Sequence, residues 1–164
     1  MKKLILFLTA LFSGSSLSIA EEKEGIIKID IQWGGYYVSK EKDKEEYSLL
    51  RLLDFNQQAY HAAIYQEKFS EIPLIEDILK LSPMIGHAPI DSKALAGKKE
   101  IHLVGSKELV SSDLEGYEYY LEHFEVEEKE RKQLISDIIG FSKEPPLKLS
   151  LQVIGDELII KERE

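Results

Sequence analysis

Residues 29–38 read IDIQWGGYYV and contain the single tryptophan of the chain, Trp33, beside two glycines and two tyrosines. Upstream, residues 27–31 alternate isoleucine with a charged residue, which is the period of a strand with one buried face. Gly34 and Gly35 supply the positive φ angles that a two-residue hairpin turn requires. The stretch therefore predicts a β-hairpin.

The hairpin register decides which aromatic rings are buried. With the two glycines as the turn, Trp33 lies opposite Tyr36 on the isoleucine face, and both rings are expected in the core. Tyr37 falls on the other face. The alternative is a ligand platform, because exposed aromatic rings beside glycine stack on sugars and contact peptides. Tyr37 and Trp33 are therefore the candidate ligand-binding or partner-binding residues.

A second hairpin is predicted near the C-terminus. Residues 147–153 alternate apolar and polar side chains, and Pro145 and Pro146 precede them. Glycine at position 155, followed by aspartate, is a favoured two-residue turn. The implied pairing places Leu151 opposite Ile160 and leaves apolar partners on a common face.

The chain between the hairpins has a mainly helical pattern, with apolar residues at spacings of three and four. Cap signals include a proline at a helix start and a Ser-x-x-Glu capping box. Helices are expected over residues 43–68, from Pro73 to before Pro83, from Ser112 to about Phe124, and over 127–139 with Gly140 as a left-handed cap. A short strand is expected over residues 101–104.

Two hairpins with one apolar face each, together with several amphipathic helices, are best buried as two layers. We expect an α+β fold in which the N-terminal and C-terminal hairpins form an antiparallel sheet and the intervening helices pack on one face. Residues 82–92, which are rich in proline and glycine, are expected to form a loop.

The N-terminus has the pattern of a secretory signal peptide. Two lysines precede an apolar run over residues 4–12, and a segment of small residues then ends at Ala20. The run is too short to span a bilayer, which takes about twenty helical residues. We expect cleavage after Ala20, no stable membrane span afterwards, and a soluble single domain over residues 21–164 in the periplasm or the medium.

The composition excludes several classes of partner and chemistry. The net charge is −9 at pH 7, so the field of the protein repels nucleic acid and anionic lipid. The chain has no cysteine, which excludes disulfides and thiol catalysis. It also lacks the glycine-rich motifs that bind dinucleotides or phosphates. We therefore expect no cofactor.

The histidines do not form a recognisable metal-binding pattern. None of the four belongs to a His-x-His or His-Glu-x-x-His motif, so no metal site is assigned. The nearest approach is His123 with Glu127, four residues apart, but a helix boundary is expected near Val126. A solvated acidic surface is the favoured explanation of this region.

His87 and Asp91 are the candidate catalytic residues. Both belong to the expected loop over residues 82–92, and loops held by rigid elements often carry active sites. A carboxylate orients an imidazole as a general base in many hydrolases. The alternative is a structural loop braced by proline.

The expected function is that of an exported, non-catalytic binding or interaction protein whose partner is a protein or peptide in the envelope or extracellular space. This expectation rests on the N-terminal pattern, the acidic composition and the absence of an assembled catalytic motif. Two alternatives stay open: a small extracytoplasmic hydrolase that uses His87 and Asp91, and an envelope structural or assembly factor that pairs through its terminal strands.

Overall fold

The computed structural model describes residues 25–164, so the predicted signal peptide, residues 1–20, lies outside the described residues. The described part of the chain forms eight strands, four α-helices and one 3₁₀ helix. In chain order they are β1 (Ile27–Ile31), β2 (Gly35–Lys40), β3 (Tyr47–Phe55), β4 (Ala59–Phe69), α1 (Ile75–Ile78), β5 (Ile85–Asp91), α2 (Lys93–Ala96), β6 (Glu100–Ser106), η2 (Ser111–Leu114), α3 (Glu115–His123), α4 (Glu128–Phe141), β7 (Leu147–Ile154) and β8 (Glu157–Glu162).

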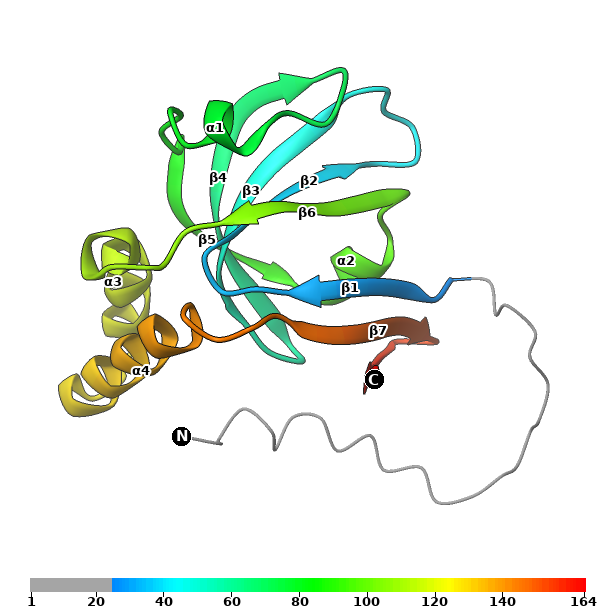
Figure 1. Cartoon of the computed structure of the whole chain (residues 1–164). Helices are drawn as coiled ribbons and strands as arrows, with labels where there is room; N and C mark the ends of the chain where they lie inside the picture. Colours follow the sequence, from blue (N-terminus) through cyan, green and yellow to red (C-terminus); the bar gives the residue numbers. More distant parts are fainter. Residues whose placement is uncertain (1–24) are drawn as a thin grey trace.

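The strands form two antiparallel sheets. The larger sheet has the order β5-β4-β3-β2-β6 and the smaller sheet has the order β1-β7-β8. Figure 1 shows β1 and β7 running below the larger sheet, α3 and α4 beside it, and α1 above it. The chain is therefore a mixed helix and strand protein, as expected, with strands dominating.

The predicted N-terminal hairpin is wrong, because β1 and β2 belong to different sheets. Gly34 has a φ of 76°, and its amide donates a hydrogen bond to the Leu52 carbonyl in β3 at 2.8 Å. A Cβ on Gly34 would collide with the carbonyl of Lys107. The glycine pair thus carries the chain from one sheet into the other, instead of turning it back along β1.

The C-terminal hairpin has the predicted pairing. β7 and β8 place Leu151 opposite Ile160, and Gly155 in the turn has a φ of 60°. β1 pairs with the other edge of β7, with Ile29 opposite Leu149. The strand predicted over residues 27–31 is therefore confirmed, but its partner lies at the far end of the chain.

The helices predicted over residues 43–68 are wrong, because this stretch forms β3 and β4. Both faces of these strands are buried: Leu49 packs in one hydrophobic core and Leu50 in another. A strand buried on both faces has a continuous apolar run in place of an alternating one. The leucines of β3 consequently mimic the spacing of a helix.

The larger sheet lies between two hydrophobic cores. The larger core includes Tyr37 of β2 and apolar side chains from the smaller sheet, α3 and α4, whereas the smaller core includes Tyr36, Val38 and Ile78 of α1. Successive residues of a strand point to opposite faces, so the two cores cover opposite faces of β2. The expectation that the helices pack on one face is therefore wrong.

Of the other predicted local elements, some are wrong and some are confirmed. Residues 85–91 form the edge strand β5, not a loop, because an edge strand tolerates proline such as Pro89. Gly140 lies inside α4 and does not cap it. By contrast, the short helix before Pro83, the strand over residues 101–104 and the helix before Phe124 correspond to α1, β6 and α3.

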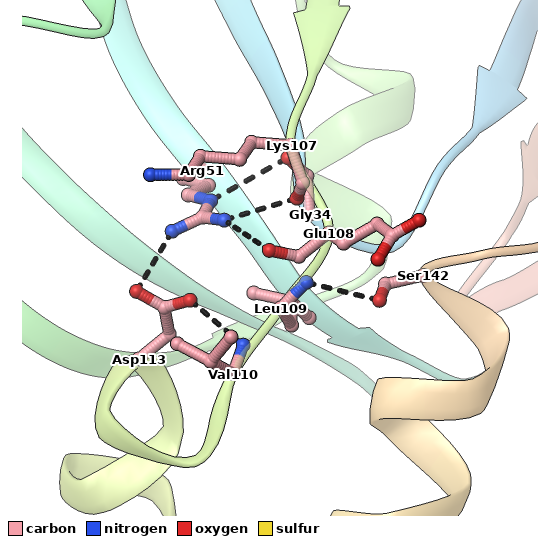
Figure 2. A network of polar contacts seen from close by, with 8 residues as sticks. All are labelled: Gly34, Arg51, Lys107, Glu108, Leu109, Val110, Asp113 and Ser142. Carbon is pink, nitrogen blue, oxygen red and sulfur yellow. Dashed lines mark hydrogen bonds and ion pairs between the residues drawn. The ribbon is translucent and has the colours of Figure 1, made fainter.

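A buried arginine holds the segment that connects β6 to α3. Figure 2 shows the Arg51 guanidinium of β3 at the centre of this network. It donates to the carbonyls of Gly34, Lys107 and Glu108 at 3.4, 3.0 and 3.4 Å. Its remaining nitrogen pairs with the Asp113 carboxylate at 3.0 Å. The planar donor fork of arginine suits this set of acceptors.

The same segment is held from its other side. The second oxygen of Asp113 accepts the Val110 amide at 2.9 Å, and the Leu109 amide donates to the Ser142 hydroxyl at 3.0 Å (Figure 2). Ser142 follows α4 directly. The start of α3 is thus tied both to the larger sheet and to the end of α4.

We predict that Arg51→Lys lowers the free energy of unfolding by about 2 to 4 kcal/mol, because lysine leaves buried acceptors without donors. Urea denaturation followed by circular dichroism measures the change. Arg163→Lys is the matched control: Arg163 also bonds a carboxylate and backbone carbonyls, but it is half-buried, and a change below about 1 kcal/mol is expected. Equal losses in the two variants would contradict the structural role of Arg51.

Candidate functional site

A buried carboxylate, Asp54, lies where β3 meets α3. A register shift between Leu52 and Asp54 places Asp54 opposite His61 of β4. Its side chain is 6% exposed and accepts three hydrogen bonds: the Trp33 indole at 3.1 Å, the Phe55 amide at 2.9 Å and the Tyr117 hydroxyl at 2.9 Å. Burial raises the pKa of Asp54, and the three hydrogen bonds act in the opposite direction.

Two histidines lie against the ring of Tyr117. The imidazole planes of His61 and His87 are nearly parallel, with 12° between them, and the nitrogens Nδ1 of His61 and Nε2 of His87 are 2.8 Å apart. Both stack on Tyr117, with centroid distances of 4.2 and 4.9 Å. Gly116 allows this contact, because a Cβ there would lie 2.9 Å from the Cβ of His87.

The histidine pair favours neutral rings. One facing nitrogen donates a proton to the other, so charging both imidazoles would place two N–H groups against each other. Burial, with the nearby His87, lowers the pKa of His61 to about 4, and burial also lowers the pKa of His87.

The cluster extends outward along α3. The Tyr120 ring lies 4.9 Å from His87 and 4.7 Å from Phe124 between centroids. His87 is half-buried and Phe124 is exposed. A continuous series of ring contacts therefore runs from the buried Asp54 partner, Tyr117, to the surface of α3.

The structure buries both aromatic residues that the sequence singled out. Trp33 is 3% exposed, which confirms its expected place in the core. Tyr37 is 2% exposed, so the sheet face that carries it is covered and its ring is not open to a ligand. The reason is that β2 is an inner strand with both faces covered. The Tyr37 hydroxyl donates to the Asp30 carbonyl at 2.6 Å and accepts the Gln32 amide at 2.8 Å.

His87 and Asp91 are both on β5 but have different partners. Four residues of strand separate them by about 13 Å. His87 bonds His61, whereas Asp91 accepts the Lys93 amide at 2.8 Å and pairs with its ammonium at 3.6 Å. Asp91 also borders an open depression of about 580 Å³, which His87 does not line. The structure therefore does not bring the two residues together.

Two further features concern the described residues as a whole. Within residues 25–164, no three or more His, Asp and Glu side chains are arranged to hold a metal ion. In the same range, no helix is long and apolar enough to cross a membrane. His123 is the last residue of α3 and Glu127 lies just before α4, so the helix boundary predicted near Val126 is confirmed.

Comparisons of the chain with protein-family models, with curated proteins and with solved structures gave no match.

The polar atoms of the cluster around Asp54 have partners within the cluster or on the backbone. Both oxygens of Asp54, the Trp33 indole, the Tyr117 hydroxyl and the facing nitrogens of the histidines bond to one another or to backbone. Such a network fixes α3 on the larger sheet and presents its outer side to solvent.

Sequence reasoning missed Asp54, His61 and Tyr117 as members of one cluster. A signal was present, because Arg51 and Asp54 interrupt the apolar run LLRLLDF, and charged residues inside such a run are buried with partners. The identity of the partners was not readable, since it depends on the register shift in β3 and on the position of α3.

We predict that the free energy of unfolding falls as the pH is lowered from about 6.5 to about 4, the range between the ordinary pKa of histidine and that of His61 in the fold. Below about 6.5 the unfolded chain binds a proton that folded His61 does not bind. The loss is about 2 to 3 kcal/mol, since one pKa unit corresponds to about 1.4 kcal/mol. Urea denaturation at a series of pH values measures it.

Two variants locate the effect. His61→Phe keeps a ring against Tyr117 without a titrating group, so its stability profile is expected to be flatter over this range. His102→Gln is the control, because His102 is exposed and lies outside the cluster. A profile for His61→Phe as steep as that of the unmodified protein would show that the pair does not couple stability to pH.

Proposed function

We propose that this protein is exported and acts as a non-catalytic binding protein whose partner is another protein or a peptide. The observation that carries the proposal is a group of large apolar side chains exposed between the end of β4 and the first residue of β5. Below, this group is called the apolar face, and it consists of Ile72, Leu74, Leu79, Met84 and Ile85.

The apolar face is not an unfilled part of the fold. Ile78 of α1 belongs to the smaller core and is 1% exposed, and the partly buried Ile75 packs against that core. A Cβ on Gly105 of β6 would lie 2.8 Å from the side chain of Ile75, so α1 is already in close contact with the larger sheet. The apolar residues that flank α1 are exposed, although the two isoleucines of α1 itself contact the smaller core.

The exposed side chains can contribute substantially to binding. Leu74 is 68% exposed and Met84 is 58% exposed. Burying a large aliphatic side chain contributes about 1.5 to 3 kcal/mol, and clustered exposed apolar residues mark interaction sites. Methionine also adapts its shape to a partner surface. These properties favour a protein or peptide partner over a small polar ligand.

Export is proposed from the sequence. The lysines, the apolar run over residues 4–12 and the small residues before Ala20 support a signal peptide. The partner is accordingly expected in the envelope or the extracellular space.

We predict that tagged protein recovered from the extracytoplasmic fraction of the exporting cell carries a stoichiometric partner in native mass spectrometry. Leu74→Ser with Met84→Ser is expected to reduce the bound fraction at least tenfold, because it removes the two most exposed side chains of the apolar face. The same measurement tests export, because removal of residues 1–20 gives a chain that starts at Glu21 and has a correspondingly lower mass.

Val153→Ser with Ile154→Ser is the matched control, because both side chains are exposed and apolar but belong to β7. This variant is expected to retain the partner. Recovery of the unmodified protein only as a free monomer would contradict the proposal, as would equal loss of the partner in the two double variants.

A further inference from the structure

Met84 is the one sulfur-containing side chain among residues 25–164. The sequence has two methionines, of which Met1 lies outside that range, and it has no cysteine. Thiols and thioethers are the side-chain groups that peroxides oxidise most readily. Oxidation of this part of the chain by a peroxide is accordingly expected at a single position.

The Met84 side chain is accessible to a dissolved oxidant. It is 58% exposed, and it lies one residue before the edge strand β5. The Met84 amide donates a hydrogen bond to the Ile64 carbonyl of β4 at 2.8 Å, and Ile85 pairs with Ile64 in the sheet. The thioether is thus presented from a fixed backbone position, and an oxidant reaches the side chain without unfolding.

The fold makes little use of this side chain. Met84 belongs to neither hydrophobic core and is not among the partly buried side chains that pack against the two cores. An oxygen added to a methionine in a core places a polar group among apolar atoms and destabilises the protein. At Met84 the added oxygen faces water while the apolar face is free, so the folded state tolerates it.

We propose that Met84 is a site of reversible oxidation to methionine sulfoxide, which makes the apolar face more polar and releases the partner. The co-reactant is a peroxide. The thioether sulfur attacks one oxygen of the peroxide, an S–O bond forms as the O–O bond breaks, and with hydrogen peroxide the other product is water. The sulfur is oxidised by two electrons and the peroxide is reduced by two, so the reaction consumes no other group of the protein.

The inference rests on the proposed function, because it names how binding at the apolar face is regulated. Methionine fits a partner surface through a flexible and polarisable side chain, whereas the sulfoxide is polar and chiral. Burying its oxygen against an apolar partner surface without a donor opposes binding. Methionine sulfoxide reductases restore the thioether, with one enzyme for each epimer. The modification therefore changes affinity reversibly and leaves the fold intact.

The first test treats the purified protein with hydrogen peroxide and follows the products by mass spectrometry. We expect one added oxygen, located at Met84, at a rate within about threefold of that of free methionine. Retention on a phenyl column measures the apolar character of the surface, and it is expected to fall on oxidation and to recover after treatment with both reductases. The urea midpoint is expected to stay unchanged, because the side chain belongs to neither core.

Two variants assign these changes to the sulfur of Met84. Met84→Leu keeps an apolar side chain without sulfur, so peroxide is expected to leave its retention where it was before treatment. Met84→Gln carries an unbranched polar side chain and is expected to show the low retention before any treatment. Oxidation more than about thirtyfold slower than that of free methionine, or an equal peroxide-induced shift in Met84→Leu, would overturn the inference.

Partner release is measured by native mass spectrometry of the complex recovered from the exporting cell. Full oxidation of Met84 is expected to lower the bound fraction about tenfold, and reduction is expected to restore it. A partner that stays bound to the oxidised protein overturns the inference and leaves the binding-protein proposal intact. Recovery of free monomer alone contradicts the binding-protein proposal, whereas the reactivity and the column retention judge the oxidation site without a partner.

Discussion

The hydrogen bonds to the Asp54 carboxylate fix the relation between the larger sheet and α3. A carboxylate that is 6% exposed costs several kcal/mol of lost hydration unless donors replace the water. Here the indole of Trp33, a backbone amide and the Tyr117 hydroxyl supply three donors. Because Tyr117 belongs to α3, the same interaction places its ring against the histidine pair and orients the outer side of the helix toward solvent.

The structure separates an inner set of polar groups, which hold elements together, from an outer set of exposed apolar and aromatic side chains. Arg51 is bonded to carbonyls and to Asp113, and the facing nitrogens of the histidines are bonded to each other. Outside, large apolar side chains flank α1, and the rings of Tyr119 in α3 and of Phe124 just after it are exposed.

The sequence predicted the elements that depend on local patterns and failed where burial on two sides or distant pairing decides the structure. The strand over residues 27–31 and the C-terminal hairpin were readable, because one face alternates regularly. Leu49 and Leu50 lie on opposite faces and are both buried, so β3 resembled a helix. His87 was noticed, but its partner His61 depends on a register shift in the sheet, and Tyr117 reaches both only through the placement of α3.

The most direct measurement of the central claim is a double-mutant cycle with Asp54→Asn and Tyr117→Phe, each change followed by urea denaturation at neutral pH. If Asp54 anchors α3, the losses of the two single variants are not additive, and the coupling free energy is at least about 1.5 kcal/mol. Additive losses, with a coupling below about 0.5 kcal/mol, would mean that α3 is held by its apolar contacts alone and would contradict the account.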